Sequence, residues 1–452
     1  MTRYLLERAW VGGAVVDDVV VEIEGGRFTE VGVLGESRTF SGEVSAENVR
    51  IPRFTGESAH RLPGLTLPGL ANAHSHAFHR ALRGRTQRER GTFWTWREQM
   101  YDVAGRLDPD SYLRLARAVY REMAAAGITT VGEFHYLHHQ PGGTPYDDPN
   151  AMGRALLQAA ADAGIRIALL DTCYLSSGFG RPVQRPQLRY SDGSAEAWAA
   201  RKAQLRPLGD PHVARGAAIH SVRAVPREQL PTVVEATRGG PLHVHLSEQP
   251  AENDDCVAAY GVTPTALLHD AGALGPDTTV VHATHLTEED VRTLGRTATT
   301  ACFCPTTERD LGDGIGPSRA LRRAGARLSL GSDSHAVVDL FEEMRAVELD
   351  ERLATRQRGH WSAAELLAAG TRHDSLGFPD AGRIEVGARA DLVTIATDTP
   401  STAGTGADEQ TAVFAATAAD VTHVVVDGRV VYDGDRAAVG RALRQEIEEV
   451  WR

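Results

Sequence analysis

The fold is decided by the stretch Thr66-Leu67-Pro68-Gly69-Leu70-Ala71-Asn72-Ala73-His74-Ser75-His76. A largely apolar run that ends in reactive side chains is typical of a strand in a parallel α/β barrel, where the active site lies at the carboxyl ends of the strands. Residues i and i+2 of a strand face the same side, so His74 and His76 can point to one position above the barrel axis. The stretch therefore predicts a first barrel strand that ends in a metal-binding motif.

The same alternation of short β-like runs with helical stretches continues along the chain, as βα units around a parallel sheet require. Helices are expected at Tyr112–Ala126, ended by Gly127, and at Ala151–Ala163, ended by Gly164. The pattern predicts an α/β fold with a (β/α)8 TIM-type barrel over residues 66–380. The eight predicted strands are Thr66–His76, Ile128–Tyr136, Ile165–Leu175, Val213–Ser221, Leu242–Glu248, Thr278–His285, Ala298–Thr306 and Arg327–His335.

The two ends of the chain carry a different pattern, of short strands without intervening helices. Val19–Ile23 and Phe28–Gly32 flank a Gly-Gly turn near the start, and Ala390–Ile395 lies near the end. Residues 421–431 contain Asp427-Gly428, a strong hairpin signal. We therefore expect a small β-sandwich domain built from residues 1–65 and 381–452, with a C-terminal helix and a polar loop at 398–411.

Composition bounds the class of protein. The chain has 452 residues, of which 42% are hydrophobic and 24% charged, as in soluble globular proteins. Its formal net charge of −12 disfavours an electrostatic nucleic-acid binder. No apolar run reaches the roughly 20 residues that a membrane helix needs, and Glu7 and Arg8 interrupt any signal-peptide core. The four cysteines suit a reducing cytoplasm better than a disulfide framework.

Further reactive side chains follow the later predicted strands. The fifth ends in His245-Leu246-Ser247-Glu248, a candidate ligand followed by a carboxylate that can move a proton beside a metal. The sixth offers His282 at the end of its apolar run and His285 as the weaker candidate, and the eighth offers Asp333. Three histidines and an aspartate at matching strand ends form a nitrogen and oxygen ligand set that suits Zn²⁺ and tolerates Fe²⁺.

Other reactive residues have structural explanations that we favour. His243 shares the face of His245 but lies one layer deeper, so it is expected to be a hydrogen-bonded core histidine. His135, His138 and His139 suggest a second metal site, yet histidines that only hydrogen-bond are the preferred interpretation. Cys302 and Cys304 lack the CxxC spacing of a zinc ribbon and are interpreted as barrel packing. Without further information, Arg97 and Arg223 would be assigned to surface ion pairs.

The order of these residues resembles the amidohydrolase superfamily over nearly the whole chain, including its small second domain. Many binuclear members bridge their metals through a lysine at the end of the fourth strand. Lys202, the only lysine, precedes our fourth strand and does not fill that place. The resemblance therefore implies a mononuclear, deaminase-like member with one divalent ion per chain, Zn²⁺ in first place, held by His74, His76, His245 and Asp333.

Four motifs resemble the formimidoylglutamate deiminases: His74–Phe78, Phe93–Arg97, Glu133–His139 and His220–Val225. The resemblance implies that Arg97, Tyr136, His220 and Arg223 hold the carboxylates of N-formimidoyl-L-glutamate, and arginine forks suit carboxylates. His79 stands where we expect the family to have glutamine; it can still donate a hydrogen bond to substrate.

The activity implied is hydrolysis of N-formimidoyl-L-glutamate to N-formyl-L-glutamate and ammonia, a step of histidine degradation. Glu248, His282 and Asp333 would be catalytic: Asp333 handles the proton of the water, Glu248 protonates the departing nitrogen and His282 stabilises the tetrahedral intermediate. We expect a cytoplasmic homodimer that acts on a small dicarboxylate and binds neither nucleic acid nor a membrane. The alternatives are a related mononuclear deaminase acting on a nucleobase or triazine, and a catalytically inactive barrel that serves as a scaffold.

Overall fold

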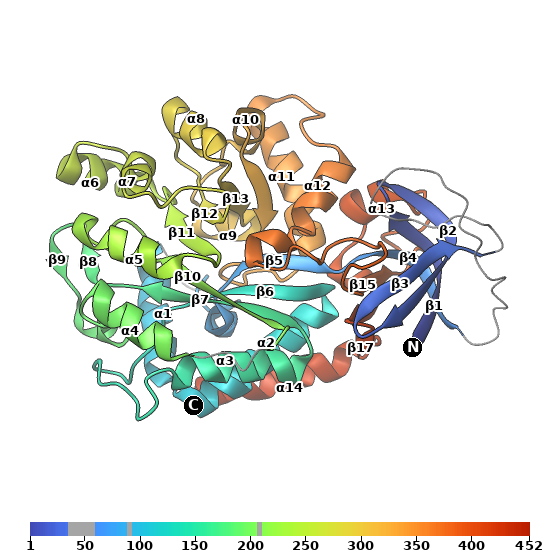
Figure 1. The fold of residues 1–452 in the computed structure, drawn as a ribbon, viewed down its shortest axis with the longest axis horizontal. Helices are drawn as coiled ribbons and strands as arrows, with labels where there is room; N and C mark the ends of the chain where they lie inside the picture. Colours follow the sequence, from blue (N-terminus) through green and yellow to red (C-terminus); the bar gives the residue numbers. More distant parts are fainter. Residues whose placement is uncertain (35–58, 88–92, 206–209) are drawn as a thin grey trace.

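The expected fold class is confirmed by the computed structural model, which describes residues 1–34, 59–87, 93–205 and 210–452. Eight parallel strands form a nearly closed barrel, and strands from both chain ends form a separate mixed sheet (Figure 1). The barrel strands follow one another in sequence order around the sheet. They are β5 (Leu70–Ser75), β6 (Ile128–His135), β7 (Arg166–Cys173), β10 (Val213–Ile219), β11 (Leu242–Leu246), β12 (Thr278–His282), β13 (Thr300–Phe303) and β14 (Arg327–Leu330).

The first and last barrel strands meet just beyond their carboxyl ends. Ser75 and Asp333 form an isolated parallel bridge. The amide of Asp333 donates to the carbonyl of His74 at 3.0 Å, and the amide of His76 donates to the carbonyl of Asp333 at 3.2 Å. Barrel closure therefore places the Asp333 backbone directly beside the histidine motif.

Helices follow the barrel strands and cover the outside of the barrel (Figure 1). The helix expected at Tyr112–Ala126 starts earlier, because Pro109 occupies its first turn and the Asp108 side chain accepts from the Ser111 amide. Gly164, at φ 77°, ends the helix at Ala151–Ala163 as expected. The helices of the barrel region are α1 (Phe93–Arg106), α2 (Pro109–Ala125), α3 (Ala151–Ala163), α4 (Ala195–Gln204), α5 (Leu230–Thr237), α6 (Pro250–Tyr260), α7 (Pro264–Asp270), α8 (Glu288–Arg296), α9 (Pro305–Leu311), α10 (Ser318–Ala324), α11 (Leu340–Thr355) and α12 (Ala363–Gly370).

The second sheet has seven strands in the order β17-β16-β15-β4-β1-β2-β3. Asp427-Gly428 makes the expected hairpin turn, with φ of 46° and 81°. The amide of Phe28 donates to the carbonyl of Ala388, so the sheet folds back on itself around a small apolar core. Its strands are β1 (Thr2–Val11), β2 (Ala14–Glu24), β3 (Arg27–Val33), β4 (His60–Pro68), β15 (Leu392–Ile395), β16 (Val421–Val426) and β17 (Arg429–Tyr432).

Two expected segments are wrong in detail. The run Thr66–His76 is not one strand, because the chain leaves β4 and enters the barrel as β5 at Gly69. A Cβ at Gly69 would lie 2.3 Å from the Thr129 hydroxyl oxygen, so only glycine permits this crossing. The loop at 398–411 ends early, because the Asp408 side chain caps the start of α13 (Glu409–Phe414).

The two sheets are joined by a buried charge cluster and a terminal helix. The fully buried guanidinium of Arg166, at the start of β7, pairs with Asp391 and, at 2.9 Å, with Asp427. The C-terminal helix α14 (Arg436–Val450) packs along α2, as Figure 1 shows in red beside the barrel. Removing both carboxylates would leave the buried arginine charge without a partner in this cluster, which proteins tolerate poorly.

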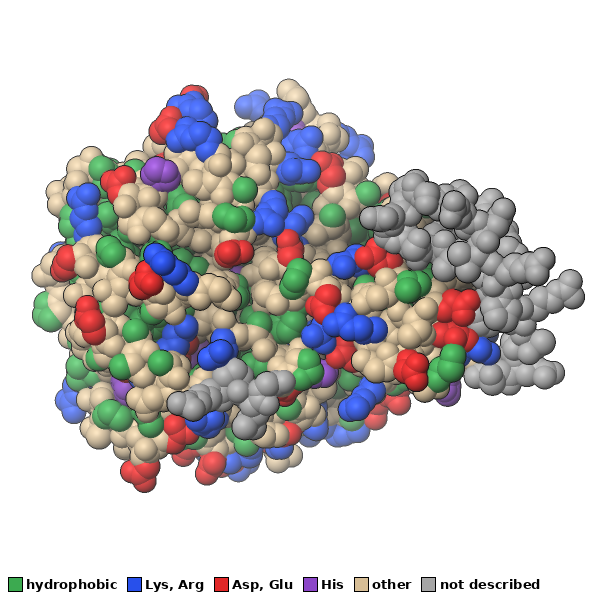
Figure 2. Space-filling model, in the orientation of Figure 1, with side chains coloured by type: hydrophobic (Ala, Val, Ile, Leu, Met, Phe, Trp, Pro, Cys, Tyr) green, Lys and Arg blue, Asp and Glu red, His purple; other side chains and the backbone are tan. Residues whose placement is uncertain are grey.

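Acidic and basic side chains are interspersed over the face drawn in Figure 2 and do not gather by sign. Within the described ranges, none of the helices combines the length and the hydropathy needed to cross a bilayer.

Candidate metal centre and active site

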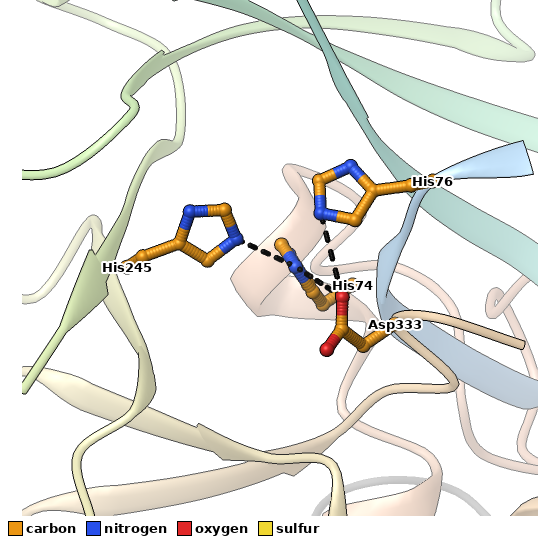
Figure 3. A group of neighbouring side chains, drawn as sticks. All are labelled: His74, His76, His245 and Asp333. Carbon is orange, nitrogen blue, oxygen red and sulfur yellow. Dashed lines mark hydrogen bonds and ion pairs between the residues drawn. The ribbon is translucent and has the colours of Figure 1, made fainter. Parts of the chain in front are cut away.

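Four buried side chains predicted as metal ligands meet at the carboxyl end of the barrel (Figure 3). His74 and His76 come from the end of β5, His245 from β11 and Asp333 from the segment after β14. The Oδ1 atom of Asp333 lies 3.3 Å from Nε2 of His74 and 3.4 Å from Nε2 of His76. Nε2 of His245 lies 3.1 Å from Nε2 of His74. The four donor atoms therefore face one point.

Backbone carbonyls orient two of these imidazoles. Nδ1 of His76 lies 3.0 Å from the carbonyl oxygen of Phe134, and Nδ1 of His245 lies 2.9 Å from that of His220. A carbonyl can only accept, so each Nδ1 carries the hydrogen and each Nε2 presents a lone pair. Nδ1 of His74 is buried without a partner among the described residues. This tautomer pattern fits binding of a cation through Nε2.

The charge states also suit a metal. Burial lowers the pKa of His74, His76 and His245, and neighbouring imidazoles add to the effect at His74 and His245. Burial opposes ionisation of Asp333, but His282 and the ligand histidines lower its pKa below the usual value. Neutral imidazoles with one carboxylate form the donor set that Zn²⁺ and Fe²⁺ accept.

The predicted catalytic residues lie beside this cluster. Nε2 of His282 is 3.9 Å from Oε1 of Glu248 and 3.8 Å from Oδ2 of Asp333. Its Nδ1 is 3.4 Å from Oε1 of Glu308, which also accepts the Cys304 amide. Burial would lower the pKa of His282, yet Glu248, Glu308 and Asp333 raise it well above the usual value. Burial raises the pKa of Glu248. The pair can therefore hold and pass a proton.

Strained backbone accompanies these side chains. Ser247, His282, Ala283, Asp333 and His335 have positive φ, although none is glycine. Such conformations cost of order 1–3 kcal/mol each and gather at functional sites. They end β11 and β12 and turn the chain after β14, so the predicted strands were too long here. The turns direct side chains over the barrel mouth.

A cavity of about 90 Å³ opens onto the metal cluster. It brings together every residue that was predicted to bind substrate. These residues are His79, Arg97, Tyr136, His220 and Arg223. The same cavity is lined by His76, His245, Glu248, His282 and Asp333.

The two arginines occupy half-buried positions on the cavity wall and are not surface residues. Nε of Arg223 donates at 2.8 Å to Oε2 of Glu252, which is buried and also accepts the Ser247 amide. Burial would lower the pKa of Arg223, but Glu252 raises it above the usual value. Nε of Arg97 donates at 2.7 Å to the Tyr101 hydroxyl. Each guanidinium is thus held on its Nε side.

His79 is buried on the same wall, where Nε2 lies 3.0 Å from the Tyr136 hydroxyl. Burial lowers its pKa well below the usual value. A neutral imidazole can donate a hydrogen bond to the tyrosine or accept one from it. The departure at position 79 therefore keeps a polar contact with a predicted substrate residue.

The remaining reactive residues mostly have the structural roles expected. Nε2 of His243 lies 3.1 Å from the carbonyl oxygen of Ser375, and His285 contacts the carbonyl oxygen of Asp313. Nε2 of His138 lies 2.8 Å from the carbonyl oxygen of Thr172. Lys202 lies on α4 and contacts the carbonyl of Ala236. Cys302 and Cys304 are buried, as expected of residues that pack inside the barrel.

Several residues on or behind the cavity wall were not anticipated. Tyr174 directly follows β7, so the strand-end argument used for the ligands could have found it. Tyr101 lies one helical turn beyond Arg97, a spacing that indicates a shared face. Gln187, Glu252 and Glu308 lie on helices behind the wall, where nothing in the sequence marks them. Cys304 approaches His282 and Asp333, although burial raises the pKa of its thiol.

Comparison with known proteins finds similar sequences and similar folds. Residues 65–431 match the model of the amidohydrolase family. The chain is 37% identical to formimidoylglutamate deiminase of Pseudomonas aeruginosa, over 92% of this chain and 96% of that protein. Its fold matches an amidohydrolase from Brucella melitensis with a TM-score of 0.88 and 28% identity, covering 100% of both chains. An adenosine deaminase from Xanthomonas campestris, solved with bound zinc, shares the fold with a TM-score of 0.83 and 23% identity, over 100% of this chain and 98% of that one.

Proposed function

Since the chain belongs to the amidohydrolase family, we propose that it hydrolyses N-formimidoyl-L-glutamate to N-formyl-L-glutamate and ammonia. The observation that carries the proposal is one cavity that joins the candidate metal centre to Arg97 and Arg223. A neutral nucleobase or triazine has no use for two guanidinium groups, whereas a linear diacid can pair with both. The 37% identity to a formimidoylglutamate deiminase supports the same substrate.

We propose one Zn²⁺ per chain, with Fe²⁺ as the second choice, held by His74, His76, His245 and Asp333. A bound divalent ion supplies Lewis-acid chemistry and makes water a nucleophile at neutral pH. The second possible group, His282 with Cys304 and Asp333, shares its carboxylate with the first. It also depends on a thiol whose pKa burial raises, so it competes poorly for an ion.

The side chains around the cluster divide the proton transfers. Water adds to the formimidoyl carbon and ammonia leaves, so a proton must leave the water and another must reach the departing nitrogen. Asp333 is ionised and accepts or orients the first proton. Glu248, whose pKa is raised by burial, delivers a proton to the nitrogen. His282, held between Glu248 and Glu308, donates a hydrogen bond to the oxygen that gains charge.

The far end of the cavity orients the substrate. Arg97 and Arg223 pair with the carboxylates, and Tyr136 and His220 contact them from the same wall. His79 acts through the Tyr136 hydroxyl, which it contacts at 3.0 Å. The protein is acidic overall, with a net charge of −12, so it attracts a dianion only locally. Binding is therefore expected to weaken as salt screens these arginines.

We predict about one equivalent of divalent metal per chain. The donor set suffices for a single ion, and Lys202 lies on α4, where it contacts the carbonyl of Ala236. Elemental analysis of protein supplemented with Zn²⁺ measures the stoichiometry. Two equivalents, or none after supplementation, would show that the cluster does not work as a mononuclear site.

Ammonia release from a substrate panel tests the proposed substrate. The panel contains N-formimidoyl-L-glutamate, adenosine, cytosine and an aminotriazine, each with the zinc-loaded protein. We expect a kcat/KM for the diacid at least about 100-fold above the others, because two buried arginine–carboxylate pairs distinguish them. A faster reaction with a ring substrate would favour a related deaminase, and no reaction with metal bound would favour a scaffold.

A further inference from the structure

The amide of Gln187 is oriented behind the cavity by its own short helix. Gln187 is fully buried on the 3-10 helix Arg185–Tyr190. Its Oε1 accepts the backbone amide of Gln184 at 2.8 Å. A backbone N–H can only donate, so Oε1 is the oxygen and the other terminal atom is the NH₂ group. The capping interaction therefore leaves the two amide hydrogens pointing away from the helix.

Those hydrogens meet two tyrosines of the cavity wall. Nε2 of Gln187 lies 3.0 Å from the Tyr101 hydroxyl and 3.0 Å from the Tyr174 hydroxyl. An amide nitrogen has two hydrogens and no acceptor capacity. Both hydroxyl oxygens must therefore accept from Gln187, and neither tyrosine can donate to it.

Arg97 donates to one of these hydroxyls and places its positive charge near the other. Its Nε donates to the Tyr101 hydroxyl at 2.7 Å, and its charge opposes the rise in the pKa of Tyr174 that burial causes. A guanidinium has no acceptor, and neither has the amide nitrogen of Gln187. The hydrogen of each hydroxyl therefore has to point elsewhere. Both tyrosines line the cavity, so the cavity is the direction that remains.

We propose that Gln187 is a positioning residue that turns the hydroxyl hydrogens of Tyr101 and Tyr174 into the cavity, where they form a carboxylate-binding subsite together with Arg97. The inference deepens the proposed function, because the carboxylate is one of the two of N-formimidoyl-L-glutamate. The two tyrosine hydroxyls are neutral hydrogen-bond donors that act in addition to the arginines of the substrate site. It also makes Gln187 a determinant of specificity without direct contact with substrate.

The composition of the subsite explains its preference for anions. Tyr101, Tyr174 and Arg97 all offer hydrogens to the cavity. Because the two tyrosine oxygens already accept from Gln187, they are not available to accept from a cationic or neutral donor group of a ligand. Burial raises the pKa of Tyr174, so its hydroxyl keeps its hydrogen. Tyr190 also lines the cavity, and its hydroxyl lies 3.9 Å from Sδ of Met100.

Gln187→Glu tests the inference without changing side-chain shape. A glutamate still accepts the Gln184 amide, but its other oxygen accepts from the tyrosines and turns their hydrogens back. Since hydrogen bonds to charged groups are among the stronger ones, we expect KM for N-formimidoyl-L-glutamate to rise about 10- to 100-fold. Metal content should stay normal and kcat should change less than about threefold. Tyr101→Phe and Tyr174→Phe should each raise KM by roughly tenfold.

Controls separate this role from a structural one. Gln204→Glu on α4, exposed, adds the same charge elsewhere, and Tyr432→Phe on β17 removes a hydroxyl outside the cavity. Both should leave KM within about threefold. Adding Gln187→Met to the Tyr101→Phe/Tyr174→Phe double variant should also change KM by less than about threefold, because no hydroxyl remains to be oriented.

The outcomes distinguish this inference from the proposed function. If the wild-type protein turns over N-formimidoyl-L-glutamate while Gln187→Glu and both tyrosine variants keep its KM, the inference is overturned and the function stands. If the wild-type protein does not turn it over, calorimetric binding of glutarate becomes the test. Weaker binding by the same variants then supports the subsite. Equal binding, or no binding to the wild-type protein, overturns it.

Discussion

Replacing Glu248 with glutamine should lower turnover by about 10²- to 10⁴-fold, the usual contribution of a positioned acid or base. Glutamine fills the same space but cannot carry the proton. Oε1 of Glu248 lies 3.9 Å from Nε2 of His282, and Glu248 is not one of the four clustered ligands. The variant should therefore keep its metal while ammonia release from N-formimidoyl-L-glutamate collapses.

Two further variants serve as comparisons for Glu248→Gln. His76→Ala removes a ligand, so it should lose both metal and activity. Glu288→Gln changes an exposed glutamate on α8 and should behave as the wild-type protein does. Elemental analysis is run beside steady-state kinetics for all three. Loss of metal from Glu248→Gln would show that Glu248 is a ligand, and the assignment of its role would be wrong.

Arg97→Met and Arg223→Met should each lower kcat/KM for N-formimidoyl-L-glutamate by roughly 30- to 4,000-fold. Truncating one partner of a buried charge pair costs on the order of 2–5 kcal/mol, and each 1.36 kcal/mol is tenfold in rate. Methionine keeps much of the side-chain volume and removes the charge. For Arg223 the change also leaves Glu252 without its partner, so the melting temperature is measured together with the kinetics.

A truncated substrate assigns each arginine to a carboxylate. N-formimidoyl-glycine has one carboxylate, so the wild-type protein should use it poorly. The variant that lacks the arginine facing the missing carboxylate should use this substrate as fast as the wild-type protein does. Arg292→Met, on the exposed face of α8, is the matched control. If both cavity variants retain the wild-type kcat/KM for the diacid, the arginines do not bind the carboxylates, although the metal chemistry can stand.

Much of the barrel could be predicted because its strands are short apolar runs between helices. The eight strands all lie within the predicted runs. The errors fall at strand ends, where Ser247, His282 and Asp333 turn the chain with positive φ. Serine, histidine and aspartate do not predict a positive φ, because glycine is the residue that usually adopts it. The crossing at Gly69 was missed for another reason: an apolar run does not show which sheet it belongs to.

The candidate metal ligands could be found because strand ends converge in a barrel, and barrel closure adds Asp333 to His74 and His76. The residues that support the cavity walls were harder to predict from the sequence. Glu252 and Glu308 act through hydrogen bonds to Arg223 and His282 that join segments far apart in the sequence. Such partners depend on how loops fold over the barrel, and no local pattern encodes that.

Identification of both products tests the central claim most directly. Zinc-loaded wild-type protein is incubated with N-formimidoyl-L-glutamate, and the products are followed by proton NMR together with an ammonia assay. We predict equal amounts of ammonia and N-formyl-L-glutamate, because the bond from the formimidoyl carbon to its terminal nitrogen is the one that breaks. Formamide with L-glutamate, or unchanged substrate in the presence of bound metal, would contradict the proposed deiminase activity.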